Sequence, residues 1–124
     1  IGILGMSFKA GTDDLRESPI VKVIEALIGK GMTLRIFDSD VSRSKIIGAN
    51  REYIEREVPH IWELVKPDLA EVVGSSDTIV IGNPSPEFRD LGGSVAASGK
   101  VVVDLVRVFD PPGPPGADYR GIAW

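Results

Sequence analysis

The sequence predicts an α/β fold, an open and mostly parallel sheet with helices on both of its faces. Short apolar runs rich in β-branched residues recur along the 124 residues, and segments with apolar residues at helical spacing separate them. The first strand, helix and strand fit within residues 1–38, the size of a βαβ unit with two parallel strands. With 43% hydrophobic residues, the chain can form one core, so residues 1–124 are expected to be a single domain.

Capping residues and glycines locate the elements of the first half of the chain. Ser18 can cap a helix whose first position is Pro19, and apolar residues at helical spacing continue that helix to Gly29. Asp38 closes the second strand. The elements predicted here are a strand at 1–4, a helix from 19 to about 29, a strand at 34–37, and short helices at 41–47 and 50–58.

The second half of the chain continues the alternation. Asp68 can cap a short helix that Gly74 stops, and the apolar run that follows is typical of a buried strand. The proline- and glycine-rich segment 111–116 predicts a rigid, irregular turn. The elements predicted here are a helix at 68–73, a strand at 78–81, a weak helix near 87–97, a strand at 100–106 and a short edge strand within 119–124.

Composition limits the classes of function. The net charge of −4 argues against nucleic acid as the main partner. The excess of acidic residues lies in 63–124, so an anion-binding surface is expected in 1–62. Cysteine is absent, which fits a cytoplasmic protein and excludes a thiol nucleophile in this chain; no metal site is expected either. No apolar run approaches the roughly 20 residues that span a bilayer, so no membrane association is expected.

The loop 5–19 carries the most information about function. It holds Lys9 and Arg16 directly after the first predicted strand, at the edge where open α/β sheets bind ligands. Lysine supplies a point charge and arginine a planar fork, both suited to phosphate, and the following helix adds the positive end of its dipole. The loop is therefore interpreted as an anion clamp, with solvated charges or pairs to nearby acids as the alternative.

Two other kinds of site fit this loop less well. A dinucleotide fingerprint would use Gly2 and Gly5, with Asp38 as the acid that binds ribose, but the spacing is not G-x-G-x-x-G and the loop is too long. A phosphoacceptor receiver domain would use the pair Asp13-Asp14. Its third strand should end in an acceptor aspartate, and here the third strand is followed by Gly82-Asn83.

Several polar and aromatic residues outside the loop have simpler interpretations. His60, Trp62 and Trp124 are interpreted as packing or surface residues. Asn83 and Ser85 follow the third strand, where a ligand contact is conceivable, but they are interpreted as loop caps.

The segment 8–19, Phe-Lys-Ala-Gly-Thr-Asp-Asp-Leu-Arg-Glu-Ser-Pro, resembles the signature that opens the C-terminal domain of the UDP-glucose/GDP-mannose dehydrogenases. The resemblance is closest to the GDP-mannose branch and covers essentially the whole chain. Its further blocks are 34–38, 48–55, 73–77, 103–106 and 121–124. It implies a Rossmann-like fold in which residues 1–124 form the nucleotide-sugar-binding domain of a larger enzyme, and the start at Ile1 inside a strand-like run agrees with such a fragment.

The resemblance also implies a chemistry. Enzymes of this family oxidise the C6 alcohol of a nucleotide sugar to the acid in two steps, with two NAD⁺ and a covalent intermediate on a cysteine. That cysteine and the NAD-binding domain would precede residue 1, so no catalytic residue is expected here and the isolated chain is expected to be inactive. Lys9 would contact the nucleotide-sugar substrate, and Arg16 would reach across the cleft to NAD. The parent would be a homodimer or higher homo-oligomer, and the GDP-mannose branch points to alginate-like polysaccharide biosynthesis.

Two features bear on the branch of the family. UDP-sugar members commonly carry an Asp-Gly-Arg-like turn after the last main strand, whereas residues 104–107 read Asp-Leu-Val-Arg, which fits the GDP-mannose branch better. The segment 111–116 departs from the expected pattern. The same domain of a UDP-glucose-type dehydrogenase, and a stand-alone nucleotide-binding module, are the alternatives.

Overall fold

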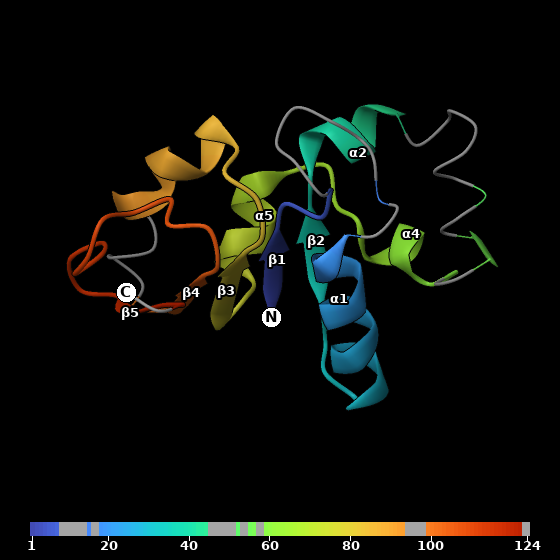
Figure 1. Cartoon of the computed structure of the whole chain (residues 1–124), viewed down its shortest axis with the longest axis horizontal. Helices are drawn as coiled ribbons and strands as arrows, with labels where there is room; N and C mark the ends of the chain where they lie inside the picture. The colour runs from blue at the N-terminus through green and yellow to red at the C-terminus, as the bar shows by residue number, and fades with distance from the viewer. Residues whose placement is uncertain are drawn as a thin grey trace.

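Five parallel strands form one sheet in the order β2-β1-β3-β4-β5 (Figure 1). The structure is a computed structural model that describes residues 1–7, 15, 18–44, 52, 55–56, 59–93 and 99–122, with the side chains of 42–44 left out. The strands are β1 (Gly2–Leu4), β2 (Arg35–Phe37), β3 (Thr78–Ile81), β4 (Val101–Asp104) and β5 (Asp118–Gly121). The parallel sheet expected from the sequence is confirmed.

Helices cover both faces of the sheet, each over its own apolar core. Adjacent β1 residues point to opposite faces, and both are fully buried: Ile3 packs into one core and Leu4 into the other. The first core includes side chains of α1, α2 and α4, and the second includes those of α5 and the 3₁₀ helix η1. The bounds are α1 (Pro19–Gly29), α2 (Ser39–Ser44), α4 (Ile61–Leu64), α5 (Leu69–Gly74) and η1 (Pro86–Leu91).

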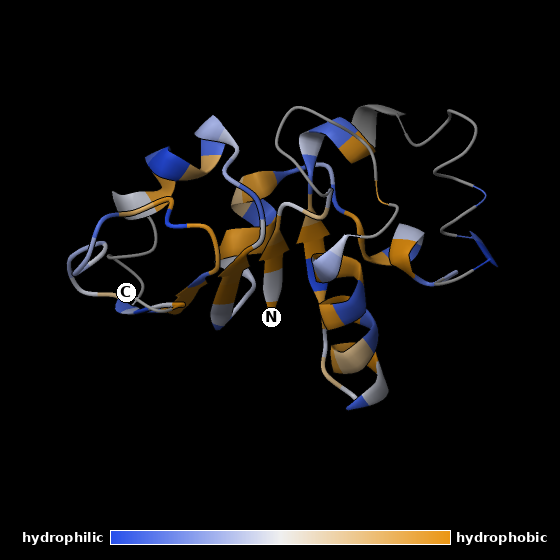
Figure 2. Cartoon of the chain, viewed as in Figure 1, coloured by the Kyte–Doolittle hydropathy of each residue, from blue (hydrophilic) through white to orange (hydrophobic). Residues whose placement is uncertain are grey.

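The distribution of apolar residues explains this layering. Figure 2 shows the central strands as largely hydrophobic, with polar residues on the outer sides of the helices that flank them. On α1, the buried residues Ile20, Val21 and Ile24 form one helical face, as the sequence pattern predicts. Burial on both faces is why β3 is a continuous apolar run rather than an alternating one.

The order of the strands creates a switch point between β1 and β3. From β1 the chain passes through α1 to β2 on one side, and it then returns to β3 on the other side of β1. Open α/β sheets bind ligands in the crevice outside the carboxyl ends of the strands at such a point. The loop after Leu4 and the loop after Ile81 meet there.

Several predicted boundaries need correction. The fourth strand ends at Asp104 instead of residue 106, because the Asp104 carboxylate accepts the N–H of Val106 and turns the chain. The first part of the weak helix predicted near 87–97 is the 3₁₀ helix η1, which begins at Pro86, and residues 94–98 lie outside the described residues. The short helix α4 was not predicted. The edge strand exists as β5, and most of the helix predicted at 50–58 lies outside the described residues.

Candidate functional site

The loop with the predicted anion clamp starts and ends at the switch point. Lys9 and Arg16 both lie outside the described residues, as does the pair Asp13-Asp14, so the structure describes the base of the loop and not the clamp itself. Ser7 near the start of the loop and Ser18 near its end are both about 1% exposed. The geometry of this base determines where the clamp can be.

Asp38 fastens the start of the loop. It follows β2, its side chain is 3% exposed, and its Oδ2 accepts the backbone N–H groups of Met6 at 2.8 Å and Ser7 at 3.0 Å. The Ser7 hydroxyl lies 3.1 Å from the same oxygen. Oδ1 accepts the N–H groups of Asp40 and Val41, both at 3.1 Å. A carboxylate offers about four acceptor positions, so these donors within the chain use both oxygens.

This arrangement counts against an autonomous dinucleotide site. In that kind of site the acid at the end of the second strand accepts hydrogen bonds from a ribose hydroxyl. Here the carboxylate of Asp38 is buried and bound to the chain's own N–H groups. Gly2 serves packing, since a Cβ there would lie 2.7 Å from the Ser76 Oγ. The glycines and the aspartate of the fingerprint therefore have structural explanations.

Asn83 fastens the same segment from the side of β3. Its side chain is 2% exposed, and its Nδ2 lies 3.2 Å from the Ser7 hydroxyl and 3.5 Å from the Asp38 Oδ2. Its Oδ1 accepts the backbone N–H of Ser85 at 3.3 Å. The interpretation of Asn83 as a loop cap is confirmed. The sequence did not show that it also bonds across the switch point to the loop after β1.

The far end of the loop is attached to its beginning. Ser18 occupies the N-cap position of α1, but its hydroxyl makes no capping bond; it donates instead to the carbonyl oxygen of Met6 at 2.8 Å. Leu15, in the second half of the loop, is fully buried in the core that contains α1, and its carbonyl accepts the N–H of Ser18. The predicted position of Ser18 is confirmed, whereas its predicted role as a side-chain cap is wrong.

Gly5 is required for this close arrangement. Its φ is +86°, a left-handed conformation that costs other residues energy, and a Cβ there would lie 2.5 Å from the Asn83 Cγ. We expect Gly5→Ala to destabilise the protein by at least about 1–3 kcal/mol, measured by urea unfolding. Gly31→Ala is the matched control: Gly31 has a φ of +80° but open space around it, so it reports the backbone strain alone. Equal losses in the two variants would show that the contact with Asn83 has no energetic weight.

A cavity of about 310 Å³ opens beside the base of the loop. It lies at the carboxyl edge of the sheet, between the start of α1 and the segments that follow β1, β3, β4 and β5. Its lining is mostly apolar, with two buried hydroxyls. The lining residues are Ser7, Ser18, Pro19, Ile20, Gly82, Leu105, Val106 and Ile122. Part of a bound molecule can thus sit against this edge, next to the loop that carries Lys9.

The loop after β4 forms another wall of this edge. The fully buried Asp104 carboxylate accepts the N–H of Val106 at 3.1 Å and of Phe109 at 3.0 Å. The Tyr119 hydroxyl lies 2.9 Å from Asp104 Oδ2 and 2.8 Å from the Phe109 carbonyl oxygen. The rings of Phe109 and Tyr119 meet edge to face at 6.3 Å. Asp104 therefore fixes the loop after β4 by accepting its N–H groups, as Asp38 fixes the start of the loop after β1.

Two local pairs of exposed charged side chains lie after β4 and on β5. Arg107 has a φ of +55° and its Nε lies 3.6 Å from the carboxylate of Asp110. On β5, a hydrogen bond from Arg120 lowers the pKa of Asp118, so its small stabilising effect is present at neutral pH and is lost as the pH falls through that pKa. Both members of that pair are exposed to solvent, which screens the interaction.

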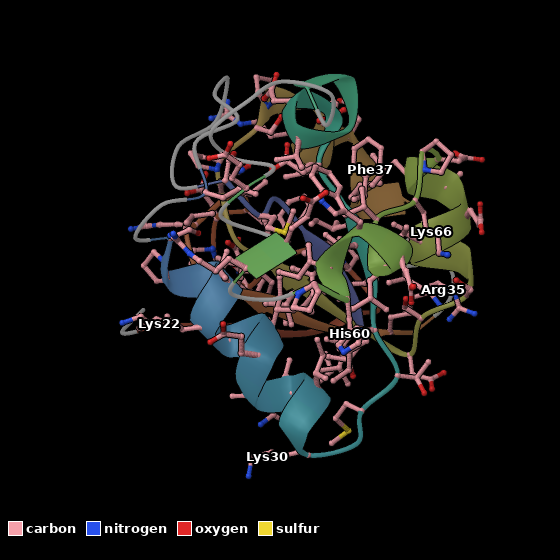
Figure 3. The ribbon with its side chains drawn as sticks, turned by 90° about the vertical axis from the view of Figure 1, so that its right-hand side faces the viewer. Lys22, Lys30, Arg35, Phe37, His60 and Lys66 are labelled. Carbon is pink, nitrogen blue, oxygen red and sulfur yellow. The ribbon has the colours of Figure 1, made fainter. Side chains whose placement is uncertain are left out.

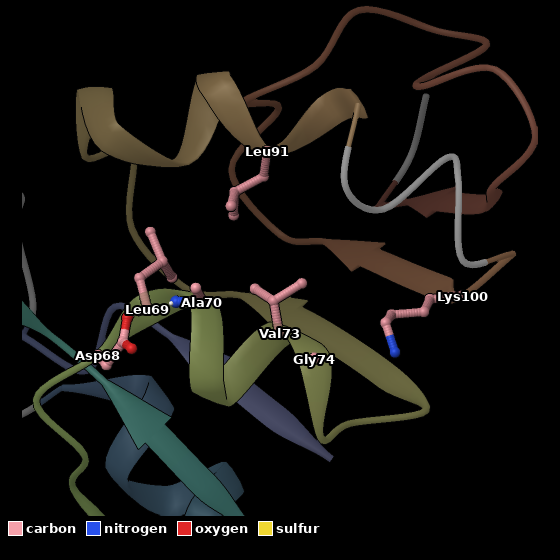
Figure 4. Close-up of a pocket in the computed structure, with 7 residues that line it drawn as sticks. All are labelled: Asp68, Leu69, Ala70, Val73, Gly74, Leu91 and Lys100. Carbon is pink, nitrogen blue, oxygen red and sulfur yellow. Dashed lines mark hydrogen bonds between the residues drawn. The ribbon is translucent and has the colours of Figure 1, made fainter.

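Other features of the described chain lie away from the switch point. A hollow of about 580 Å³ lies between α5 and η1, where Leu69, Val73 and Leu91 face one another and the Lys100 side chain lies at one end (Figure 4).

His60 is exposed at the start of α4 (Figure 3), as expected for a surface residue. Among the described helices, none is long and apolar enough to cross a membrane. The described part of the chain also contains no group of three or more His, Cys, Asp or Glu that could hold a metal ion.

Comparisons with known proteins agree with this architecture. Residues 2–111 match the model of the "UDP-glucose/GDP-mannose dehydrogenase family, UDP binding domain". The chain is 52% identical over its whole length to GDP-mannose 6-dehydrogenase of Pseudomonas aeruginosa, of which it covers 28%. It is 32% identical to UDP-glucose 6-dehydrogenase of Rickettsia felis, over 89% of this chain and 23% of that protein.

A solved structure gives the same result in three dimensions. The crystal structure of a ternary complex of GDP-mannose dehydrogenase from Pseudomonas aeruginosa superposes on 99% of this chain with a TM-score of 0.86 and 53% identity. The match covers 28% of that chain, so the present chain spans little more than a quarter of these relatives. From the match over residues 2–111 and the full-length identity, the chain belongs to the UDP-glucose/GDP-mannose dehydrogenase family and corresponds to its UDP binding domain.

Proposed function

We propose that this chain is the nucleotide-sugar-binding domain of an NAD-dependent enzyme that oxidises GDP-mannose to GDP-mannuronate. The observation that carries the proposal is the difference in identity between two kinds of relative. The chain is 52% and 51% identical to GDP-mannose 6-dehydrogenases of Pseudomonas aeruginosa and Azotobacter vinelandii, but 32% identical to a UDP-glucose 6-dehydrogenase. The parent protein would supply precursor for an alginate-like polysaccharide and act in the cytoplasm as a homodimer or higher homo-oligomer.

In this proposal the loop after β1 binds the phosphate-bearing part of the substrate. Lys9 contacts the nucleotide sugar, and Arg16 reaches the NAD held across the cleft. Support comes from the base of the loop, which is fastened at the switch point by Asp38 on one side and Asn83 on the other. A fixed base limits the entropy that the loop loses when a charged side chain engages phosphate.

NAD is bound mainly by the part of the protein outside this chain. Among the described residues, the acid in the position that would bind ribose is Asp38, and its carboxylate serves the chain's own N–H groups. When bound, NAD⁺ would supply the oxidising power for C6, two equivalents for the conversion of the alcohol to the acid, with water as the source of the second oxygen. This chain contributes binding and orientation of the nucleotide sugar, since it has no cysteine that could form the covalent intermediate.

The isolated chain should have no dehydrogenase activity. With purified residues 1–124, GDP-mannose and NAD⁺, we expect no NADH formation above a blank without protein, measured at 340 nm. The physical reason is that neither the nucleophile nor the main NAD site belongs to these residues. Turnover by the fragment would contradict the proposal and would favour an autonomous enzyme.

The alternative within the family is a UDP-glucose-type dehydrogenase. Competition on the full-length parent distinguishes the two: we expect GDP-mannose to be oxidised, and excess UDP-glucose to inhibit that oxidation weakly. If UDP-glucose were the better substrate, the alternative would replace the proposal. If neither sugar were oxidised, a nucleotide-binding module without this activity would be the better account.

A further inference from the structure

We propose that Asp38 is a positioning residue for the substrate contact at Lys9. Its buried carboxylate fixes the direction in which the chain leaves β1, two residues before Lys9. The inference rests on the proposed function, because it assigns to Asp38 an effect exerted through the substrate-binding loop. Asp38 itself is 3% exposed, so the effect would not involve contact with the substrate.

The carboxylate joins two segments that are far apart in the sequence. One oxygen holds the N–H groups at the start of α2, and the other holds those of Met6 and Ser7. A backbone bond of 2.8 Å from the Gly5 N–H to the Phe37 carbonyl continues the pairing of β1 and β2 to the residue before Asp38. The segment after β1 is thus tied to a helix and a strand that the core holds in place.

Ser7 is held from both neighbouring strands. Its hydroxyl lies 3.1 Å from the Asp38 Oδ2, after β2, and 3.2 Å from the Asn83 Nδ2, after β3. These bonds are shielded from water, because Ser7, Asp38 and Asn83 are each at most 3% exposed. Buried polar networks of this kind hold one geometry when satisfied and are costly when one member is lost.

Both ends of the loop meet at Met6. Its N–H donates to Asp38, and its carbonyl oxygen accepts from the hydroxyl of Ser18, which begins α1. A change at Asp38 therefore loosens the start of the loop and the point to which its far end is attached. This is the physical route by which a buried residue after β2 would affect Lys9.

Asp38→Asn is the sharpest variant, because it keeps the size of the side chain. One carboxylate oxygen is replaced by an NH₂ group, and N–H donors face both oxygens in the structure. In either orientation of the asparagine amide, its NH₂ group would face backbone N–H donors. In the full-length parent we expect kcat/KM for GDP-mannose to fall about ten- to a hundredfold.

A double-mutant cycle with Lys9→Ala tests whether the effect passes through Lys9. If Asp38 positions Lys9, adding Asp38→Asn to Lys9→Ala should lower kcat/KM by no more than about threefold beyond Lys9→Ala alone, because the shared interaction is already lost. Asn83→Ala replaces Asp38→Asn in the cycle if that variant does not fold. Val72→Ala is the control: it removes buried methyl groups from the α5 side, and its effect should be small and independent of Lys9.

Each outcome decides the question. Fully multiplicative losses, or an unchanged kcat/KM in Asp38→Asn, would show that Asp38 is only structural and would overturn the inference while the proposed function stands. If the wild type did not oxidise GDP-mannose, or if Lys9→Ala left kcat/KM unchanged, the proposed substrate site would be wrong. This inference would then fail with it. A large loss for Asp38→Asn that disappears in the Lys9→Ala background would support it.

Discussion

Replacing Lys9 by alanine in the full-length parent should reduce kcat/KM for GDP-mannose by about 30- to 1000-fold. A lysine that pairs with a phosphate of the bound substrate contributes on the order of 2–4 kcal/mol, and its truncation leaves that charge unpaired. The measurement is the initial rate of NADH formation at substrate concentrations well below KM. Arg16→Ala should instead raise the KM for NAD⁺, since the proposed partner of Arg16 is the cofactor.

Lys30→Ala is the matched control for this prediction. Lys30 is an exposed lysine at the end of α1 opposite to the loop, as Figure 3 shows, so its removal changes the net charge equally without touching the switch point. Its kcat/KM should stay close to the wild-type value. Equal losses in the two variants would mean that only overall charge matters, and no loss in either would mean that Lys9 is a solvated loop charge.

Replacing Asp104 by alanine should destabilise the domain by about 2–5 kcal/mol. The substitution removes a fully buried acceptor and leaves the N–H groups of Val106 and Phe109 without it. It also removes one of the two acceptors beside the Tyr119 hydroxyl. Urea unfolding of the 1–124 chain, followed by circular dichroism, measures the change in the free energy of unfolding.

Asp110→Ala is the control for that experiment, because it removes an exposed carboxylate instead of a buried one. The Asp110 side chain is 94% exposed and sits in the same loop, so its loss should change stability very little. If Asp104→Ala were as mild as Asp110→Ala, the buried carboxylate would not organise this loop. Tyr119→Phe should fall between the two, because it removes only the hydroxyl.

The first three strands could be predicted closely from the sequence because each is a largely apolar run that a charged, polar or glycine residue ends. The edge strand β5 is not apolar, so its sequence gives a much weaker signal. The predicted bounds of β3 match the structure, and β1 and β2 differ by one residue. The cap at Asp68 was also found, since its carboxylate accepts the N–H of Ala70 at 3.0 Å as local sequence rules require. Local signals of this kind are visible in a single sequence.

The roles of Asp38, Asn83 and Ser18 could not be predicted, because they depend on contacts across the sheet. Asp38 bonds to residues 31 and 32 positions earlier, and Asn83 to a residue 76 positions earlier. Local rules assign Ser18 to a helix cap, but its hydroxyl is oriented to donate to the distant Met6 carbonyl, and its oxygen accepts no N–H of α1. Strand order decides which loops meet, and a single sequence does not specify it.

The central claim is that this domain belongs to an enzyme that acts on GDP-mannose, and substrate preference tests it most directly. The measurement is kcat/KM of the wild-type full-length parent for GDP-mannose and for UDP-glucose, from NADH formation under identical conditions. We expect a preference for GDP-mannose of at least about 100-fold, the size of discrimination that contacts to a different base and sugar can give. Equal efficiency with both sugars, or a preference for UDP-glucose, would contradict the account.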